Sequence, residues 1–208
     1  RYFLKGISMA VKGERTRRRV IEEALPLFSV KGYFNTSISD ILAATALTKG
    51  GLYCHFPSKE DIWYAVYDEA VNIWRHTVFS NMRTVDDPLE RIAQTGERVL
   101  NRYLEGEIFD GGCFFVNMLV ELSGQSAAMT RHILRGFVGF AKLFQRWLKE
   151  AEARDQLRAG LDFKEVANFI VITLNGAATL FAASRDKAVL HRTNRQLQTY
   201  LALLKKPV

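Results

Sequence analysis

The chain has 208 residues, of which 48% are hydrophobic and 25% are charged, as in ordinary globular proteins that bury a substantial core. This composition excludes a disordered or fibrous chain, and two cysteines are too few for a disulfide framework or a structural zinc site. The net charge of +7 is uneven, because residues 1–59 carry ten Lys and Arg against four Asp and Glu, whereas residues 60–208 carry nineteen against eighteen.

The first segment, residues 1–13, is predicted to be an N-terminal tail. Arg1 to Ser8 lack the long apolar region of a secretion signal, and Met9 is the expected native start. A basic amphipathic helix is predicted from Glu14 to Val30, because its apolar residues recur with helical period and Lys31-Gly32 is a usual helix end. Pro26 lies inside this pattern and is expected to disturb the helix.

Two short helices joined by a turn are predicted between residues 37 and 56. Ser37 can cap the first, and Asp40 adds favourable charge at its N-terminus. Thr48 can cap the second, which Pro57 ends after about two turns. Such a unit holds one short helix rigidly enough to lie in the DNA major groove.

The second short helix presents polar groups outward, because Leu52 and Phe56 lie four residues apart and can anchor it to a core. Ser58 then begins a third helix, and its free N–H groups and Lys59 suit a phosphate. Candidate contacts to base edges and phosphates are Lys49, Gly50, Tyr53 and His55. Further candidates for DNA binding, which would position the DNA backbone, are Arg17, Thr36, Ser37, Thr48 and Lys59.

These residues resemble the TetR family of bacterial transcriptional regulators. The motifs that carry the resemblance are Thr16-Arg17-Arg18-Arg19, Ala24, Leu27-Phe28, Lys31-Gly32-Tyr33, Thr36, Ile41, Lys49-Gly50, Leu52-Tyr53, His55-Phe56 and Ser58-Lys59-Glu60-Asp61. Two positions depart from the pattern: Ala46 replaces the usual turn glycine, where a positive φ would cost alanine roughly 1 kcal/mol, and Cys54 replaces a common aromatic residue.

The remaining chain is predicted to be helical, so the fold class is all-α. A helix from Lys59 to about Phe79 is followed by five further helices, which are expected over residues 88–105, 113–122, 127–153, 163–183 and 187–205. The resemblance implies a DNA-binding domain over residues 14–60 and an effector-binding and dimerisation domain over residues 61–208. The longest apolar stretch, residues 163–183, is interrupted by polar and charged residues, so a membrane span is not expected.

The resemblance also implies a homodimer whose interface is formed by the last two helices. Its candidate residues are Phe169, Ile172, Asn175, Gly176, Thr179, Leu180, Leu190, Leu197, Tyr200, Leu201 and Leu204. The alternative is that these apolar stripes are core within one chain. A dimer with twofold symmetry suits a pseudo-palindromic operator, because its two recognition helices lie about one DNA turn, or a multiple of one turn, apart.

A small, largely apolar effector is the expected ligand of the second domain. Its candidate contacts are Trp63, Tyr67, Tyr103, Cys113, Asn117, Glu121, Phe140 and Phe144, with core packing as the alternative for each. Cys113, at a helix start where thiol pKa values are lowered, is a candidate electrophile sensor, with a semi-buried cap residue as the alternative.

The favoured function is a cytoplasmic repressor that leaves its operator when the effector binds. The alternative is an all-helical small-molecule carrier whose DNA-binding domain is vestigial. Four scattered histidines give no metal-ligand spacing, and no nucleophile–base or phosphate-loop motif is evident. Neither an enzyme nor a metal or other cofactor is therefore expected.

Overall fold

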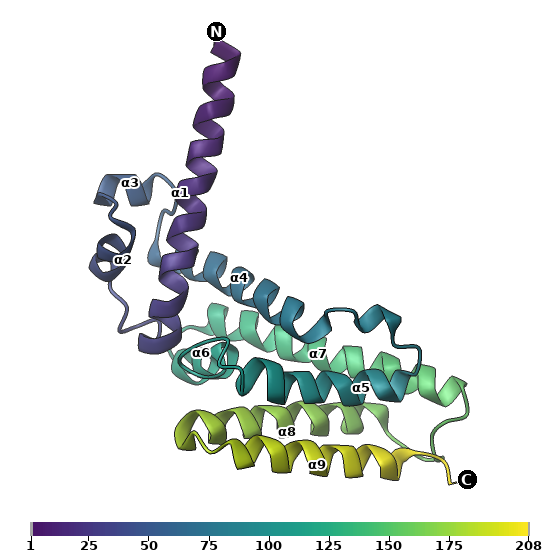
Figure 1. The fold of residues 1–208 in the computed structure, drawn as a ribbon. Helices are drawn as coiled ribbons and strands as arrows, with labels where there is room; N and C mark the ends of the chain where they lie inside the picture. Colours follow the sequence, from purple (N-terminus) through teal and green to yellow (C-terminus); the bar gives the residue numbers. More distant parts are fainter. Residues whose placement is uncertain (1, 208) are drawn as a thin grey trace. The chain divides into compact units, whose positions relative to one another are not determined.

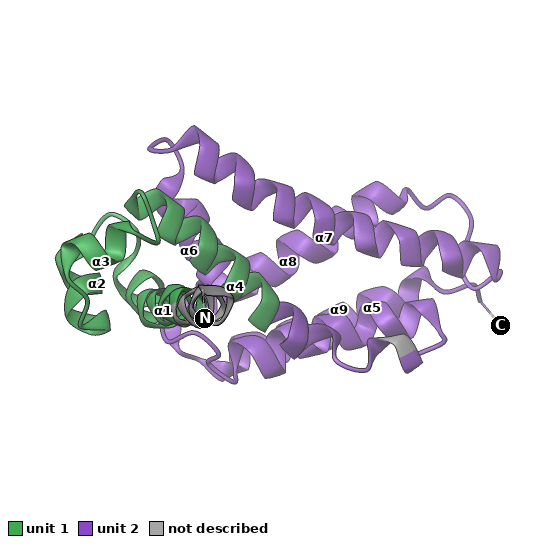
Figure 2. Cartoon of the chain, turned by 90° about the horizontal axis from the view of Figure 1, so that it is seen from above, with its two compact units in different colours: residues 1–73 green, residues 74–208 purple. Residues whose placement is uncertain are grey.

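The computed structural model describes the backbone of residues 2–207 and the side chains of residues 13–82 and 84–207. Within this range nine α-helices and two short helices of other types occur, and no strand is present. The all-α prediction is confirmed. The chain divides into two compact units, Arg1–Ile73 and Trp74–Val208, which Figure 2 colours separately. The domain boundary expected at residue 60 stays a prediction.

Unit 1 contains the predicted helix-turn-helix. Its helices are α1 (Tyr2–Lys31), α2 (Ile38–Thr45), α3 (Lys49–Tyr53) and most of α4 (Lys59–Phe79). Helix α1 starts well before the expected Glu14, so the segment predicted as a tail is helical from Tyr2. Pro26 lies within α1 without ending it. Because proline has no N–H, the carbonyl of Glu22 lacks its usual helical donor. Pro26 and Glu22 are both exposed, so water can donate to that carbonyl instead.

Unit 2 is a helical bundle in which α7 and α8 pack most extensively against each other. Its elements are η1 (Met82–Thr84), α5 (Pro88–Glu97), the π-helix η2 (Arg98–Leu104), α6 (Phe114–Leu122), α7 (Ala127–Ala153), α8 (Phe163–Ser184) and α9 (Lys187–Leu204). Helix α7 packs against α5, α6 and α8, and α8 and α9 lie side by side along their length (Figure 1). Phe114, Phe144, Phe181 and Leu190 are almost fully buried, and they mark its core.

The helix expected over residues 88–105 changes type within its length. It is α-helical to Glu97 and then π-helical, and the N–H of Glu105 donates to the carbonyl of Leu100 at 3.0 Å. The π-turn leads into a tight bend at Gly106, where a Cβ would collide with the carbonyl oxygen of Arg102. Apolar spacing alone does not distinguish these two helix types, because one π-turn shifts the pattern by a single residue.

Among the described helices, only α8 is long and apolar enough to cross a membrane. Within the structure, 44% of its most apolar stretch is buried. Helices of this kind also form the cores of soluble proteins. Here α8 packs against α7 and α9 and buries one face within unit 2. Its other face remains open.

Candidate nucleic-acid interface

Helix α2 begins with a reciprocal cap. The N–H of Asp40 donates to the Ser37 hydroxyl at 3.0 Å, and the N–H of Ser37 donates to the Asp40 carboxylate at 2.8 Å. The Asp40 carboxylate also accepts from the Lys31 ammonium at 2.9 Å. Hydrogen bonds from Ser37, and then from Lys31, hold the pKa of Asp40 well below its usual value. The cap therefore carries a negative charge at the N-terminus of α2, where the helix dipole favours it.

The turn between α2 and α3 contains Ala46 in a left-handed conformation, with φ of 49° and ψ of 34°. This positive φ is the conformation in which alanine was expected to be strained. Alanine in this region costs about 1 kcal/mol relative to glycine. The turn nevertheless forms, so the departure from the family pattern does not abolish the helix-turn-helix.

Helix α3 is short and is held from its inner side. The Thr48 hydroxyl accepts from the N–H of Gly51 at 3.2 Å, while Leu52 is fully buried and Phe56 is 2% exposed. On the outer side Lys49 and Gly50 are exposed, and the Tyr53 side chain is 39% exposed. The helix thus presents an ammonium, a phenol and an uncovered backbone on one surface.

Helix α1 supports one end of this surface. The guanidinium of Arg17 lies 4.9 Å from the centre of the Phe56 ring, so a cation–π contact fixes its position. His55 is half-buried, and its ring lies near Gly13 of α1. Both side chains therefore belong to the packing of α1 against the segment that follows α3.

Thr36 and Lys59 do not lie as expected. Thr36 is fully buried, and its hydroxyl donates to the carbonyl of Gly32 at 2.6 Å, so the prediction of a DNA contact there is wrong. The Lys59 ammonium donates to the carbonyls of Tyr33 at 2.9 Å and Thr36 at 3.0 Å, and it lies 4.3 Å from the centre of the Tyr33 ring. Lys59 therefore ties the start of α4 to the loop after α1 instead of presenting its charge outward.

Two family profiles match the chain. Residues 20–66 match the description "Bacterial regulatory proteins, tetR family", and residues 88–197 match "Tetracyclin repressor-like, C-terminal domain". The chain belongs to the TetR family. It is therefore a DNA-binding transcriptional regulator and not an enzyme.

Individual TetR-family relatives agree over most of the chain. The repressor DhaR of Mycobacterium sp. (strain GP1) is 28% identical over 174 residues, which are 84% of this chain and 86% of DhaR. A TetR transcriptional regulator from Chloroflexus aurantiacus is 28% identical with a TM-score of 0.88, covering 95% of this chain and 99% of that one. A CifR cysteine mutant complexed with a 26-bp double-strand operator DNA shares the fold, with 22% identity, a TM-score of 0.70, and coverage of 86% and 94%.

The effector candidates of this TetR-family chain fall into separate groups. Trp63 and Tyr67 belong to unit 1, where they lie 5.3 Å apart between ring centres. The other six belong to unit 2. Tyr103, Cys113 and Asn117 lie around the start of α6, and the amide of Asn117 donates to the carbonyl of Gly111 at 2.7 Å.

A second group in unit 2 is aromatic. The rings of Phe140 and Phe144 lie 4.6 Å apart, and Trp74 lies 5.1 Å from Phe140. Glu121 is half-buried on α6. Phe144 is fully buried, whereas Phe140 and Trp74 are half-buried. The role of this group in ligand binding stays a prediction.

Cys113 has the opposite electrostatics from those expected of a sensor. It is the N-cap residue of α6 and is 6% exposed. Burial raises the pKa of its thiol, and this effect outweighs the hydrogen bond from the Tyr103 hydroxyl at 3.5 Å. The expectation of a lowered pKa is wrong, because the desolvation of the thiolate outweighs the helix N-terminus.

The predicted dimer residues divide into an open face and a core. Phe169 is 49% exposed and Ile172 is 69% exposed on α8. Gly176 and Thr179 are also exposed on that helix, and Asn175 is half-buried. A Cβ placed on Gly176 would meet nothing within 4 Å. This face is the open side of α8.

Four of the leucines on α9 are buried within the chain, contrary to the expectation of a partner contact. Leu190, Leu197, Leu201 and Leu204 are at most 3% exposed. They lie on the side of α9 that packs against α5 and α8, and a Cβ on Gly96 would clash with Leu197. They stabilise the monomer instead of facing a second chain.

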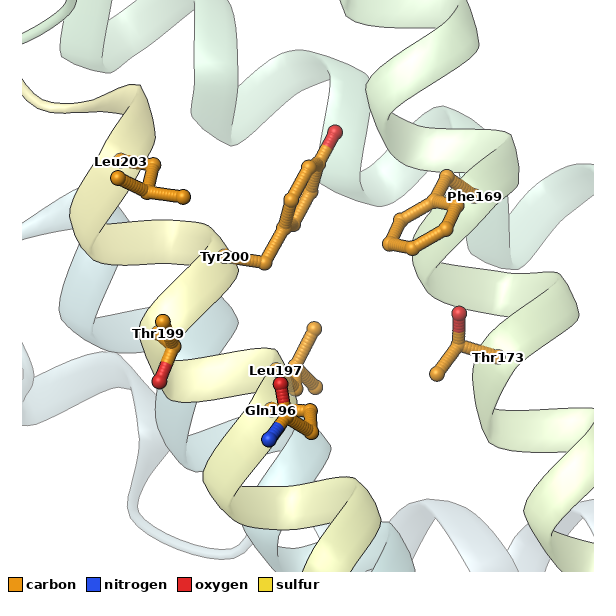
Figure 3. A pocket seen from close by; sticks show the side chains of 7 residues that line it. All are labelled: Phe169, Thr173, Gln196, Leu197, Thr199, Tyr200 and Leu203. Carbon is orange, nitrogen blue, oxygen red and sulfur yellow. The ribbon is translucent and has the colours of Figure 1, made fainter.

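A groove between α8 and α9 includes four residues that were not predicted, Thr173, Gln196, Thr199 and Leu203. It is lined by Phe169, Thr173, Gln196, Leu197, Thr199, Tyr200 and Leu203, and Figure 3 shows these side chains around the hollow. The rings of Phe169 and Tyr200 lie 4.6 Å apart between centres. The signal was the spacing of three and four residues from Gln196 through Leu203, which places polar and apolar side chains on the open face of α9.

Proposed function

We propose that this chain is a homodimeric repressor that binds a pseudo-palindromic operator through α3. The observation that carries the proposal is the Thr48-capped helix, anchored by Leu52 and presenting Lys49 and Tyr53 outward. A short helix held in this way can enter the major groove, which is wide enough for an α-helix. The repressor name of DhaR and the operator complex of CifR support the same reading. Its site of action is the cytoplasm, where operator DNA lies.

Tyr53 tests the DNA surface. A bound sequence selected from a random duplex library serves as the operator, and an unrelated duplex of equal length serves as the reference. Tyr53→Ala should weaken binding to the operator more than binding to the reference, because base contacts carry sequence information and phosphate contacts do not. Equal loss on both duplexes would contradict the role of Tyr53 in base recognition.

The dimer proposal rests on the open apolar face of α8 and α9. Ile172 on α8 is 69% exposed, and Leu203, which lines the groove from α9, is 65% exposed. Pairing two such faces would bury apolar side chains in a four-helix arrangement, which is favourable by about 25 cal/mol for each Å² removed from water.

The dimer is tested by sedimentation equilibrium with matched variants. Ile172→Glu should yield monomers, whereas Val120→Glu should not, although Val120 on α6 is 70% exposed, nearly the same as Ile172. A wild-type chain that sediments as a monomer at micromolar concentration would contradict the proposal. Dimerisation that survives Ile172→Glu would place the interface elsewhere.

The effector proposal concerns the aromatic side chains of unit 2. Phe140 and Phe144 on α7 and Phe115 on α6 form a continuous set with Trp74. A guest among these rings would be small and apolar, and it would release DNA if it bound the conformation with unsuitable spacing of the recognition helices. Hydrophobic compounds can be screened for release of labelled operator, with Phe140→Ala as the variant expected to alter the response. A releasing compound whose effect is unchanged in Phe140→Ala would contradict this location.

A further inference from the structure

The excess positive charge of unit 2 is concentrated on one helix. Residues 74–208 contain nineteen Lys and Arg and fourteen Asp and Glu, an excess of five. Residues 122–149, which include most of α7, contain five Lys and Arg and no acidic residue. We call these five the α7 basic stripe: Arg131, Arg135, Lys142, Arg146 and Lys149. Unit 2 outside the stripe is therefore balanced in charge.

The stripe occupies one face of α7. Successive members are separated by three, four or seven residues, and residues at these spacings share a face of an α-helix. All five side chains are exposed. From Arg131 to Lys149 the stripe extends for about 27 Å at roughly 1.5 Å per residue.

Several cations of unit 2 outside the stripe have anionic partners. Arg91 pairs with Glu150 at 2.6 Å, and Arg154 pairs with Asp86 at 2.9 Å. Among the side chains that the structure describes, none pairs ionically with a member of the stripe. Arg135 contacts His132 at 3.1 Å, but a histidine supplies no negative charge.

Such an arrangement does not stabilise the fold. Arg131 and Arg135 lie four residues apart, as do Lys142 and Arg146. Like charges at this spacing destabilise a helix slightly, by the amount that opposite charges would stabilise it. An anionic partner outside the chain would remove this repulsion.

We propose that the α7 basic stripe is a second, sequence-independent contact with the phosphates of duplex DNA. This inference rests on the DNA-binding function and adds a contact outside the helix-turn-helix. Duplex DNA is an uninterrupted anion that carries one charge per about 1.7 Å of its axis. A straight row of cations of one sign, about 27 Å long, matches about eight base pairs at roughly 3.4 Å each.

An acidic protein is the competing partner. Leu134 is 44% exposed and Val138 is 52% exposed beside the stripe, and an apolar centre is usual in protein interfaces. Aromatic residues, which commonly supply the strongest contacts in such interfaces, are not fully exposed on α7, because Phe137, Phe140 and Trp147 are half-buried. The length and single sign of the stripe favour a nucleic acid over a protein.

The experiment compares two triple variants of the full chain with equal loss of charge. The stripe variant is Arg131→Gln, Lys142→Gln and Arg146→Gln. The control is Arg102→Gln, Arg158→Gln and Lys164→Gln, three exposed cations of unit 2 that lie outside α7. Binding to a 60-bp duplex of random sequence is measured by fluorescence anisotropy from 50 to 200 mM KCl. Thermal unfolding of both variants establishes that they fold.

The slope of log Kobs against log[KCl] is the decisive quantity. Each phosphate contact contributes about 0.9 to its magnitude, so the stripe variant should lose about 2 to 3 and the control none. Equal slopes for the stripe variant and the control would overturn the proposal and leave an acidic protein as the partner. A folded stripe variant should retain the wild-type ratio of operator to random affinity, because phosphate contacts carry no sequence information.

Two further duplexes identify the source of the DNA. If flanking DNA is bound, the wild type should bind a 60-bp duplex centred on the operator more tightly than a 20-bp operator, and the stripe variant should lose this advantage. If a second duplex is bound, the wild-type complex with the 20-bp operator should capture a labelled random duplex, and the stripe variant should not. The absence of both effects would overturn the proposal. If the wild type bound the operator no more tightly than a random duplex, the proposed function would be contradicted instead.

Discussion

Replacing Lys59 should destabilise the helix-turn-helix without changing its contacts with phosphate. The Lys59 ammonium donates to two carbonyls, of Tyr33 at 2.9 Å and Thr36 at 3.0 Å, and lies over the Tyr33 ring. Hydrogen bonds to a charged group contribute about 1.5–3 kcal/mol each, and a cation–π contact adds about 0.5–1 kcal/mol. Because Lys59 is half-buried and water can replace part of these contacts, Lys59→Met should cost about 2–4 kcal/mol.

The assay is hydrogen exchange of the full chain, read by mass spectrometry over residues 13–56. A loss of about 2 kcal/mol corresponds to a decrease of about thirtyfold in amide protection. Lys49→Met, on the exposed face of α3, is the matched control and should change stability by less than about 0.5 kcal/mol. A structural role for Lys59 would be refuted if Lys59→Met left amide protection unchanged while lowering the magnitude of the salt slope by about 0.9, the signature of a phosphate contact.

Three further predictions concern backbone and charge. Ala46→Gly should raise the free energy of unfolding by up to about 1 kcal/mol in urea titration, because φ is 49° at this residue; an unchanged midpoint would argue against strain. Gly106→Ala should lower Tm because its Cβ would meet the carbonyl of Arg102, and an unaltered Tm would contradict that close approach. Hydrogen bonds from Ser37 depress the pKa of Asp40 in the folded protein, so this carboxylate should contribute its whole stabilisation above the unfolded pKa near 3.9 and lose it as the pH falls below that value. If Asp40→Asn lost stability equally steeply on acidification, this carboxylate would be excluded as a cause.

The helices were predictable where caps and apolar spacing agree. Helix α7 has the expected bounds, because Ser126 caps it and apolar residues such as Ile133 and Phe144 recur along one face. The capped start at Asp162 likewise fixed the beginning of α8. These signals are local, so the sequence contains them in full.

The contacts and exposure of individual side chains were not predictable, because they depend on how distant segments pack. Lys59 has the spacing of a phosphate ligand at a helix start, but its ammonium reaches the loop at Tyr33, twenty-six residues away. Leu197 and Ile172 are both apolar residues of amphipathic helices, yet one is 1% exposed and the other 69%. Periodicity predicts that a helix has an apolar face, but only the packing shows whether that face contacts the same chain or remains exposed.

The electrostatic interpretation was also limited by burial. The start of α6 suggested a reactive thiol at Cys113, but desolvation raises the pKa of that thiol.

The basic stripe of α7 was not apparent in the charge count for residues 60–208, because the four acidic residues of α4 between Glu60 and Glu69 offset most of it. Dividing the chain after Ile73 separates these charges.

The most direct test of a sequence-specific dimer is selection of bound sequences from a random duplex library by the full chain, at a salt concentration that suppresses non-specific binding. The α3 surface of Lys49, Gly50 and Tyr53, presented twice by a dimer, predicts enrichment of an inverted repeat whose half-site centres lie about one DNA turn, or a multiple of one turn, apart. Binding that falls with salt but enriches no sequence would contradict the account, because a basic surface without base recognition would then explain all the affinity.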